Sequence, residues 1–442
     1  MKALIIAAGM GSRLRHNRDD TPKPLNTLLG LTLIERVILS AKEAGIKDFI
    51  ITLGFQAKRI MDYLRDGKRW GINIEYVYNP EWYRGNGTSV LKAEEKLNGE
   101  KFILLMADHI FSPYILKKLK EYRLEDGCVM VVQKNLKKIT SLEDETKVRV
   151  ENGYVTAIHR NLESFDGIDA GIFLCSPTIF KTLEKSTRYG KGSLTEGLSL
   201  LVKKKKLLAL EYGDGILCNI NTPKDLKFAR RLLLDSTKKP SDGIISKFLN
   251  RKISLFLTNH LVKTRITPNL LTILSFIISL VSGLLFLSRI PLWAGISAQI
   301  SSIIDGMDGE VARLKFQKSR FGAYMDSILD RYGDAFIILS MTLSHYLLYH
   351  NLSIWIIGFF ALIGSFMSML TKERFHTVME IPYSIEKEGW LRYIPMTRDV
   401  RLFIIMLAGI TNQIFLGLLI LAILTNLKTI LRLGFIKRIA QR

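Results

Sequence analysis

The chain has 442 residues, of which 48% are hydrophobic, so it has room for two or more domains. Its 63 lysines and arginines against 41 aspartates and glutamates give a formal net charge of +22 at pH 7, yet no nucleic-acid-binding motif is present. The basic residues lie largely beside long apolar runs or near candidate phosphate sites, so the composition favours anionic lipid headgroups and anionic substrates over nucleic acid as partners.

The first segment, residues 1–232, mixes charged and apolar stretches as a soluble α/β protein does. It begins with a predicted buried strand, Ala3–Ala7, followed by a glycine-rich turn from Ala8 to Leu14 and by Thr21-Pro22-Lys23-Pro24. Such a turn presents backbone N–H groups to phosphates, and Arg13 and Lys23 can neutralise a triphosphate. The spacing lacks the third glycine of a dinucleotide fingerprint and the Gly-Lys-Ser/Thr of a P-loop, so it indicates neither.

Taken whole, this opening resembles the signature of the sugar-phosphate nucleotidyltransferases. Further predicted strands, at residues 49–53, 74–78, 102–106, 129–133 and 170–174, extend the resemblance over residues 1–232. It implies a Rossmann-like α/β fold with a mixed sheet, catalytic roles for Lys23 and Arg13, and a Mg²⁺ ligand at Asp108, which closely follows a strand. The nucleotide contacts that it implies are Ala8, Gly9, Gly11, Arg13, Lys23, Gly87 and Thr88. Without the resemblance, the segment around Gly87 is an ordinary turn followed by a helix cap.

The sugar-phosphate site has a weaker signal. The segment Asp169-Ala170-Gly171 resembles the place where such enzymes hold the sugar phosphate, and Lys147 is the candidate to reach that phosphate. One position departs from the pattern, because Asn219 stands where relatives often carry a second metal-binding Asp. A neutral oxygen ligand binds a metal more weakly, so a domain that keeps the fold but has lost activity is an alternative interpretation.

The next segment changes character. Residues 233–243 are polar and rich in lysine, serine and proline, which predicts a linker. Residues 244–266 mix apolar residues with Lys247, Arg251 and Lys252 in a helical rhythm, which predicts a juxtamembrane helix lying in the membrane interface. A first transmembrane helix is the competing interpretation.

Long apolar runs dominate the remainder, residues 267–442, and predict an all-α polytopic membrane domain. The runs are residues 269–288, 290–312, 333–350, 352–370 and 402–424, the last continuing toward 432. A polar break at Thr411-Asn412-Gln413 divides the fifth run into two helices, which gives six transmembrane helices.

The basic residues predict the sidedness of these helices. The connections around Lys315–Arg320 and Lys372–Arg401 and the tail after Arg432 are basic, whereas the opposite connections carry only Arg289. By the positive-inside rule, the N-terminal domain and the C-terminus are expected in the cytoplasm of a multi-pass protein of the cell membrane.

Four aspartates interrupt the apolar runs. Asp305 and Asp308 stand three residues apart, and Asp326 and Asp330 four apart, so each pair projects from one face of a helix. Two facing helices can converge these carboxylates on one or two hard cations, Mg²⁺ or Mn²⁺, since no Cys or His cluster suggests zinc. A transporter's proton relay or structural ion pairs are what the acids alone would also allow.

With Gly309, Arg313 and Gly322, these acids match the signature of the CDP-alcohol phosphotransferases. The resemblance implies metal ligands at Asp305, Asp308, Asp326 and Asp330, with Asp330 also the catalytic base that takes the proton of the acceptor hydroxyl. It implies nucleotide contacts at Gly309, Arg313 and Gly322, and a homodimer formed through the membrane helices. The candidates for an acceptor's phosphate are Arg265, Lys318, Lys372 and Arg374, each of which is otherwise a positive-inside marker.

The order of the two parts resembles the bifunctional enzymes of di-myo-inositol phosphate synthesis over nearly the whole chain. That resemblance implies formation of CDP-inositol from CTP and inositol 1-phosphate, then attack of a second inositol 1-phosphate to give di-myo-inositol phosphate phosphate and CMP. The main alternative is a CDP-lipid-dependent phosphatidylinositol-phosphate-type synthase with an accessory or inactive nucleotidyltransferase domain. A transporter or scaffold with a nucleotide-sensing domain is the non-enzymatic alternative.

Overall fold

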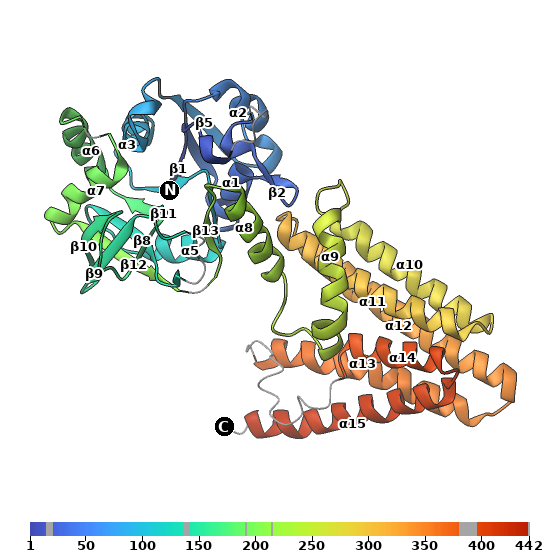
Figure 1. Cartoon of the computed structure of the whole chain (residues 1–442). Helices are drawn as coiled ribbons and strands as arrows, with labels where there is room; N and C mark the ends of the chain where they lie inside the picture. The colour runs from blue at the N-terminus through green and yellow to red at the C-terminus, as the bar shows by residue number, and fades with distance from the viewer. Residues whose placement is uncertain are drawn as a thin grey trace. The chain divides into compact units, whose positions relative to one another are not determined.

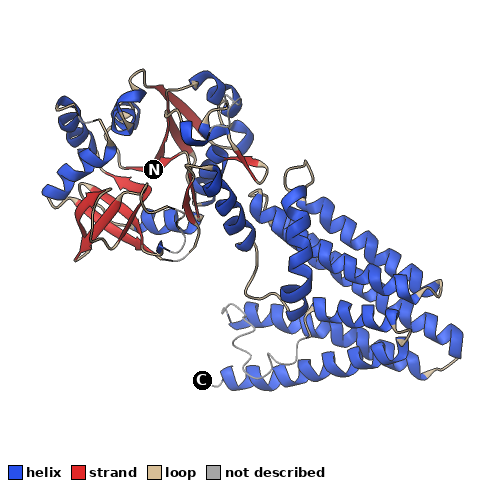
Figure 2. Ribbon diagram, in the orientation of Figure 1, coloured by secondary structure: helices blue, strands red, loops and turns tan. Residues whose placement is uncertain are grey.

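The computed structural model describes residues 1–14, 21–136, 139, 141–190, 192–213, 215–379 and 396–440. They form two compact units, Met1–Leu233 and Leu234–Arg442 (Figure 1). The N-terminal unit contains strands and helices, and the C-terminal unit is helical throughout the part that the structure describes (Figure 2). The last helix of the α/β sequence, α8 (Pro223–Asp235), crosses the division between the units.

A nine-stranded mixed sheet forms the centre of the N-terminal unit, in the order β5-β4-β1-β6-β11-β8-β12-β10-β9. Strand β1 pairs in parallel with β4 and β6, whereas β11 pairs antiparallel with β6 and β8. The strands are β1 (Lys2–Ala7), β4 (Asp48–Leu53), β5 (Asn73–Tyr78), β6 (Phe102–Met106), β8 (Cys128–Gln133), β9 (Lys147–Glu151), β10 (Tyr154–His159), β11 (Gly167–Cys175) and β12 (Leu207–Tyr212). All six strands predicted from apolar runs lie within this sheet.

Helices complete two apolar cores, one on each face of this sheet. Alternate residues of β1 show the division, since Ala3 and Ile5 belong to one core and Leu4 and Ile6 to the other. The helices are α1 (Leu33–Glu43), α2 (Ala57–Leu64), α3 (Asn86–Leu91), α4 (Glu94–Leu97), α5 (Pro113–Glu121), α6 (Thr178–Arg188), α7 (Leu194–Lys203) and α8. Capping boxes at Thr32 and Ser193 fix where α1 and α7 begin.

Two short ladders lie beside the main sheet. Strands β2 (Thr27–Leu28) and β3 (Leu31–Thr32) form one, and β7 (His109–Phe111) and β13 (Leu217–Asn219) form the other. The antiparallel register of the second ladder sets Asn219 opposite His109. This pairing brings the C-terminal end of the α/β sequence to the residue that follows Asp108.

Six helices of 13 to 30 residues follow the juxtamembrane segment in the described part of the C-terminal unit. A π-helical turn (η6, Ser246–Asn250) leads into α9 (Arg251–Leu261), after which come α10 (Pro268–Leu287), α11 (Pro291–Leu314), α12 (Arg320–Tyr349), α13 (Ser353–Met379), α14 (Arg398–Ile410) and α15 (Ile414–Ala440). Prolines open α10 and α11, where a missing N–H costs nothing. The break between α14 and α15 falls at the predicted Thr411-Asn412-Gln413.

Three of the described helices are long and apolar enough to cross a membrane: Pro268–Leu287, Ser353–Phe375 and Ile414–Lys437. The predicted six spans are therefore not confirmed by length and composition. Helices α11 and α12 fall short because they carry ionisable side chains, and α14 has only 13 residues. Most of the basic connection that supports the predicted sidedness, residues 380–395, and the end of the tail, residues 441–442, lie outside the described residues.

Helices α11 and α14 meet backbone to backbone at a pair of glycines. A Cβ on Gly295 would lie only 2.7 Å from the carbonyl oxygen of Met406, and one on Gly409 would collide with the carbonyl oxygen of Pro291. Small residues at a helix–helix interface permit this close approach. The contact fixes how far Arg398, at the start of α14, lies from the acidic part of α11.

Candidate active sites

The glycine-rich turn after β1 forms one wall of a cavity of about 310 Å³, here called the Lys23 cavity. Gly11 has φ +62°, and a side chain there would collide with Lys23, so the turn lies directly over this lysine. Of the predicted residues, the structure brings together Gly9, Gly11, Arg13, Lys23 and Asp108 around the cavity. Asn221, which the sequence did not single out, completes the wall.

Lys23 is the central cation of this cavity. Its Nζ forms an ion pair with Asp108 and donates to Asn221 Oδ1 at 2.9 Å. Burial would raise the pKa of Asp108, but the charge of Lys23 and the hydrogen bond with His109 outweigh it and hold that pKa below its ordinary value. The cavity therefore presents an ionised carboxylate beside a lysine, a pairing able to hold a metal-bound phosphate.

A second cavity, of about 200 Å³, shares Arg13, Asp108 and Asn221 with the first, and we call it the His109 cavity. His109 Nδ1 lies 2.8 Å from Asp108 Oδ1. Burial raises the pKa of Asp169 to about 6. The other residues that line the His109 cavity include Asn86, Glu145, Arg160, Asp169, Gly171 and Asn219. Asn219 Oδ1 is buried with no hydrogen-bond partner among the described residues, so this neutral oxygen remains available to a ligand.

Four predicted residues of this unit line neither cavity. Ala8 is buried, and its carbonyl accepts from Phe55 N at 3.0 Å. Gly87 packs so closely that a Cβ would lie 2.7 Å from Gly192 O, while the buried Thr88 hydroxyl donates back to its own turn. Lys147 Nζ lies 5.2 Å from the centre of the Phe165 ring. Asn86 and Arg160 line the His109 cavity instead.

The four predicted aspartates come from two helices that are consecutive in the chain, α11 and α12. Asp305 and Asp308 on α11 and Asp326 on α12 each offer a carboxylate oxygen, and these oxygens lie within 4.8 Å of one another. Thr272 of α10 donates to Asp308. Asp326 Oδ1 is buried without a hydrogen-bond partner among the described residues. Convergent oxygen ligands, one of them unpartnered, fit a hard divalent cation such as Mg²⁺.

Asp330, the fourth aspartate, is held by an arginine that the sequence did not single out. Arg398 Nη1 of α14 lies 2.9 Å from Asp330 Oδ1 and 3.1 Å from Asp305 Oδ2. The same guanidinium contacts Asp334 at 3.0 Å through Nε, and Arg401 reaches Asp334 at 3.1 Å. Helix α14 therefore supplies the positive charge that balances part of the acidic cluster.

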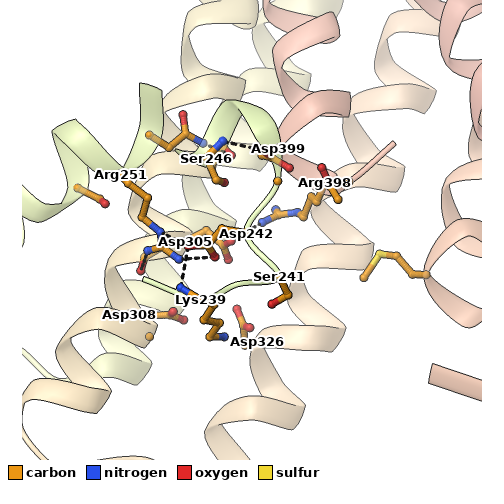
Figure 3. Close-up of a pocket in the computed structure, with 18 of the residues that line it drawn as sticks. Lys239, Ser241, Asp242, Ser246, Arg251, Asp305, Asp308, Asp326, Arg398 and Asp399 are labelled. Atoms are coloured by element: carbon orange, nitrogen blue, oxygen red, sulfur yellow. Dashed lines mark hydrogen bonds and ion pairs between the residues drawn. The ribbon is translucent and has the colours of Figure 1, made fainter. Parts of the chain in front are cut away.

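Two cavities meet beside Asp308 and Asp326. The Asp305 cavity, of about 440 Å³, is drawn in Figure 3 and includes Asp305, Arg398 and Lys372. The Gly322 cavity, of about 390 Å³, includes Gly322 and Asn269. Both are lined by Lys239, Asp308, Gly309, Arg313 and Asp326. A ligand with a central anionic group and two different ends can occupy both cavities at once.

Arg313 is a second cation at this junction. Its Nη1 lies 3.0 Å from where a Cβ of Gly309 would stand, so a larger residue there would crowd the guanidinium. Its buried Nε and Nη2 have no hydrogen-bond partner within the described ranges. Lys318 and Lys372, predicted to bind phosphate, line the Gly322 and the Asp305 cavity respectively. The other two candidates, Arg265 and Arg374, are exposed and line neither.

Residues 265–431 match the model of the CDP-alcohol phosphatidyltransferase family, and residues 3–178 match the MobA-like NTP transferase domain. Over 435 residues the chain is 35% identical to a bifunctional IPC transferase and DIPP synthase of Aquifex aeolicus, covering 97% of this chain and 96% of that one. A protein of the same name from Thermococcus kodakarensis is 34% identical, with 98% and 97% covered. A solved inositol-1-phosphate CTP transferase from T. maritima aligns with 52% of this chain and 95% of its own, at 23% identity and a TM-score of 0.48.

Proposed function

We propose the function from the premise that this chain belongs to the family of bifunctional IPC transferases and DIPP synthases, two of which it matches over nearly their whole length. The chain is a transferase with a nucleotidyltransferase domain and a CDP-alcohol phosphotransferase domain. It makes CDP-inositol and diphosphate from CTP and inositol 1-phosphate. It then joins CDP-inositol to a second inositol 1-phosphate, giving di-myo-inositol phosphate phosphate and CMP.

The first reaction is assigned to the Lys23 and His109 cavities. A phosphate oxygen of inositol 1-phosphate attacks the α-phosphorus of CTP, and the bond to the β-phosphate oxygen breaks as diphosphate leaves. Lys23 and Arg13 lower the negative charge that the two anions bring together. Asp108, with Asn219 as a neutral second ligand, would hold Mg²⁺, which stabilises the charge of the leaving diphosphate.

The second reaction is assigned to the aspartate cluster, and the convergence of Asp305, Asp308 and Asp326 is the observation that carries it. A hydroxyl oxygen of the acceptor attacks the inositol-linked phosphorus of CDP-inositol, and the bond to the CMP oxygen breaks. The hydroxyl proton passes to Asp330, whose contact with Arg398 orients the carboxylate. The three convergent aspartates would hold Mg²⁺ or Mn²⁺, which supplies charge stabilisation at the diphosphate.

The two adjoining cavities suggest how the substrates divide. The Gly322 cavity, with Asn269 and the small residue Gly322, is open enough for the cytidine. The Asp305 cavity, with Arg398 and Lys372, offers cations to a phosphorylated acceptor. The diphosphate then lies at their junction, beside Arg313 and the convergent carboxylates. This placement sets the attacking and leaving oxygens on opposite sides of the reacting phosphorus.

The proposed setting is a membrane that helices α10 to α15 cross, with the N-terminal unit and the C-terminus in the cytoplasm. The helical segment 244–261 lies in the interface, because it exposes apolar side chains at Phe248, Ile253 and Phe256. Membrane lipids are then its partners. A homodimer through the membrane helices completes this arrangement.

Mass spectrometry of products from the purified protein tests the whole proposal. With CTP, Mg²⁺ and inositol 1-phosphate, and no added substrate lipid, we expect a soluble phosphorylated di-inositol together with CMP and diphosphate. Omission of Mg²⁺ with a chelator should stop both reactions. CDP-inositol without CMP would leave only the first reaction, and CMP released only after addition of a CDP-lipid would identify a lipid synthase instead.

A further inference from the structure

The segment predicted as a linker, residues 233–243, contacts helices of the C-terminal unit. Asp242, near its end, accepts two hydrogen bonds from Arg251, at 2.8 Å from Nε and 2.9 Å from Nη2. Both side chains of this pair are only 9% exposed. Arg251 Nη1 in turn donates to Gly306 O and to the buried Glu310 on α11. The linker is therefore tied to the helix turn that carries Asp305.

A second attachment is made to helix α14. Asp399 Oδ2 accepts from Ser246 N at 2.7 Å, and a side chain on Gly243 would collide with the same carboxylate. Asp399 directly follows Arg398 on α14. The segment from Lys239 to Ser246 is therefore fixed at two places, one beside Asp305 and one beside Arg398, and it passes along the Asp305 cavity that all these residues line.

Lys239, in this segment, lies at the junction of the Asp305 and Gly322 cavities. Its backbone N–H donates to Asp242 Oδ2 at 3.0 Å, so the arginine pair that holds Asp242 also holds Lys239. Its side chain lines both the Asp305 and the Gly322 cavity, and its charge acts on the Asp308 carboxylate. Figure 3 draws it between Asp308 and Asp326. Among the described residues, no ion-pair partner is found for its amine within 4 Å.

We propose that Lys239, supplied by the segment at the start of the C-terminal unit, binds the diphosphate of the nucleotide substrate in the C-terminal site. This inference rests on the proposed second reaction. A lysine at this point faces the carboxylates that would hold the divalent cation, and an anionic diphosphate between the two is attracted by both. Asp242 and Arg251 act as positioning residues, since they fix the backbone from which the amine extends.

Steady-state kinetics of CMP release measure the effect. Lys239→Ala should raise KM for CDP-inositol about tenfold or more, as expected for loss of a charge-assisted phosphate contact. Lys239→Arg should restore most of the affinity. Lys238→Ala is the matched control, because its neighbouring amine pairs with Asp235 at 2.6 Å and is half exposed. Diphosphate release from CTP should be unchanged in all three variants. An unchanged or lower KM in Lys239→Ala would mean that Lys239 only offsets the carboxylates, and would overturn the proposal.

Chemical labelling of lysine amines separates this inference from the reaction on which it rests. With CDP and Mg²⁺ present, Lys239 of the intact protein should be acylated several times more slowly, and Lys238 at its former rate, as read by peptide mass spectrometry. Absence of protection in a protein that releases CMP would refute the role of Lys239 and keep the second reaction. If the wild type releases no CMP, the proposed second reaction is wrong, while protection by CDP still decides whether Lys239 binds a diphosphate.

Discussion

The Lys23 cavity and the Asp305 cavity both set carboxylates beside a cation, but in different proportions. In the N-terminal unit a single carboxylate, Asp108, pairs with a single lysine, and the glycine turn adds backbone N–H groups. In the C-terminal unit three carboxylates converge, and Arg398 contacts only Asp305 among them. The first site is nearly balanced by the protein itself. The second is unbalanced, because Asp308 and Asp326 have no ion-pair partner among the described residues, so its geometry depends more on bound cations.

The largest expected effect follows from removing one carboxylate of the unbalanced site. Asp308→Ala should lower CMP release from CDP-inositol at least about a thousandfold, because a bound metal ion contributes several kcal/mol to stabilising the transition state. Diphosphate release from CTP should stay at the wild-type rate. Asp235→Ala, at an exposed aspartate, is the control. Equal loss of both reactions would mean that the two sites do not act separately.

A substitution in the Lys23 cavity should instead lower the first reaction and leave the second unchanged. Lys23→Ala removes the cation that faces Asp108, and diphosphate release should fall roughly 10²–10³-fold, as for loss of one preorganised electrostatic contact. CMP release from supplied CDP-inositol should continue unchanged. Both rates are measured on the same preparation, with the exposed Lys42→Ala as reference. A fall in CMP release as well would show that Lys23 also supports the C-terminal site.

The unfolding temperature of each unit also separates the two regions. Glu310 is fully buried and accepts hydrogen bonds from Arg251, Ser254 and Thr258, each at 2.6 Å. Glu310→Ala leaves a buried guanidinium partly unpaired, which should cost about 3–5 kcal/mol and lower the unfolding midpoint of the C-terminal unit by about 10 °C.

Each unit has its own signal for that measurement. All three cysteines are buried in the N-terminal unit, so a thiol-reactive dye reports the unfolding of that unit alone. Circular dichroism at 222 nm reports mainly the helices of the C-terminal unit. The helical midpoint should fall while thiol exposure keeps its midpoint. A parallel shift of both would mean that the two units unfold together.

The smallest expected effect tests which of two cations contacts the phosphate of inositol 1-phosphate. Lys147 was predicted from the sequence, whereas Arg160 lines the cavity in the structure. Arg160 lines the His109 cavity, whereas Lys147 lies against the Phe165 ring. Arg160→Ala should raise KM for inositol 1-phosphate in the first reaction about three- to tenfold, as expected for an exposed charge contact. Lys147→Ala should change it less than about twofold. The opposite order would return the phosphate contact to Lys147.

The sequence predicts best where a pattern is local. The apolar runs predict β1 and β6, and the turn between Ala7 and Lys23 identifies the first cavity because its residues are close in the chain. Carboxylates within apolar runs are unusual enough to be recognised alone, so Asp305 and Asp326 are found too. Strands β9 and β10 were not predicted, since their half-exposed residues form no apolar run.

Residues that reach a site from a distance are harder to predict. Arg398 and Arg401 stand just before the last apolar run, and no spacing shows that Arg398 contacts Asp330. The sequence around Lys239 gives no sign of a role in binding, since a polar segment has the same composition whether it is solvated or packs against a cavity. Asn221 likewise depends on the β7 and β13 pairing, which joins residues about a hundred positions apart.

Because Gly295 packs against α14, the number of residues between Gly295 and Asp305 determines where the carboxylates of α11 point. Gly295 sets where α11 touches α14, and the carboxylates of Asp305 and Asp308 point from a later turn of the same helix. One inserted residue between Gly295 and Asp305 would rotate both carboxylates by about 100° about the helix axis. They would then face away from Asp326. Insertions and deletions are therefore tolerable in the connections that flank α11 and not between its glycine and its aspartates.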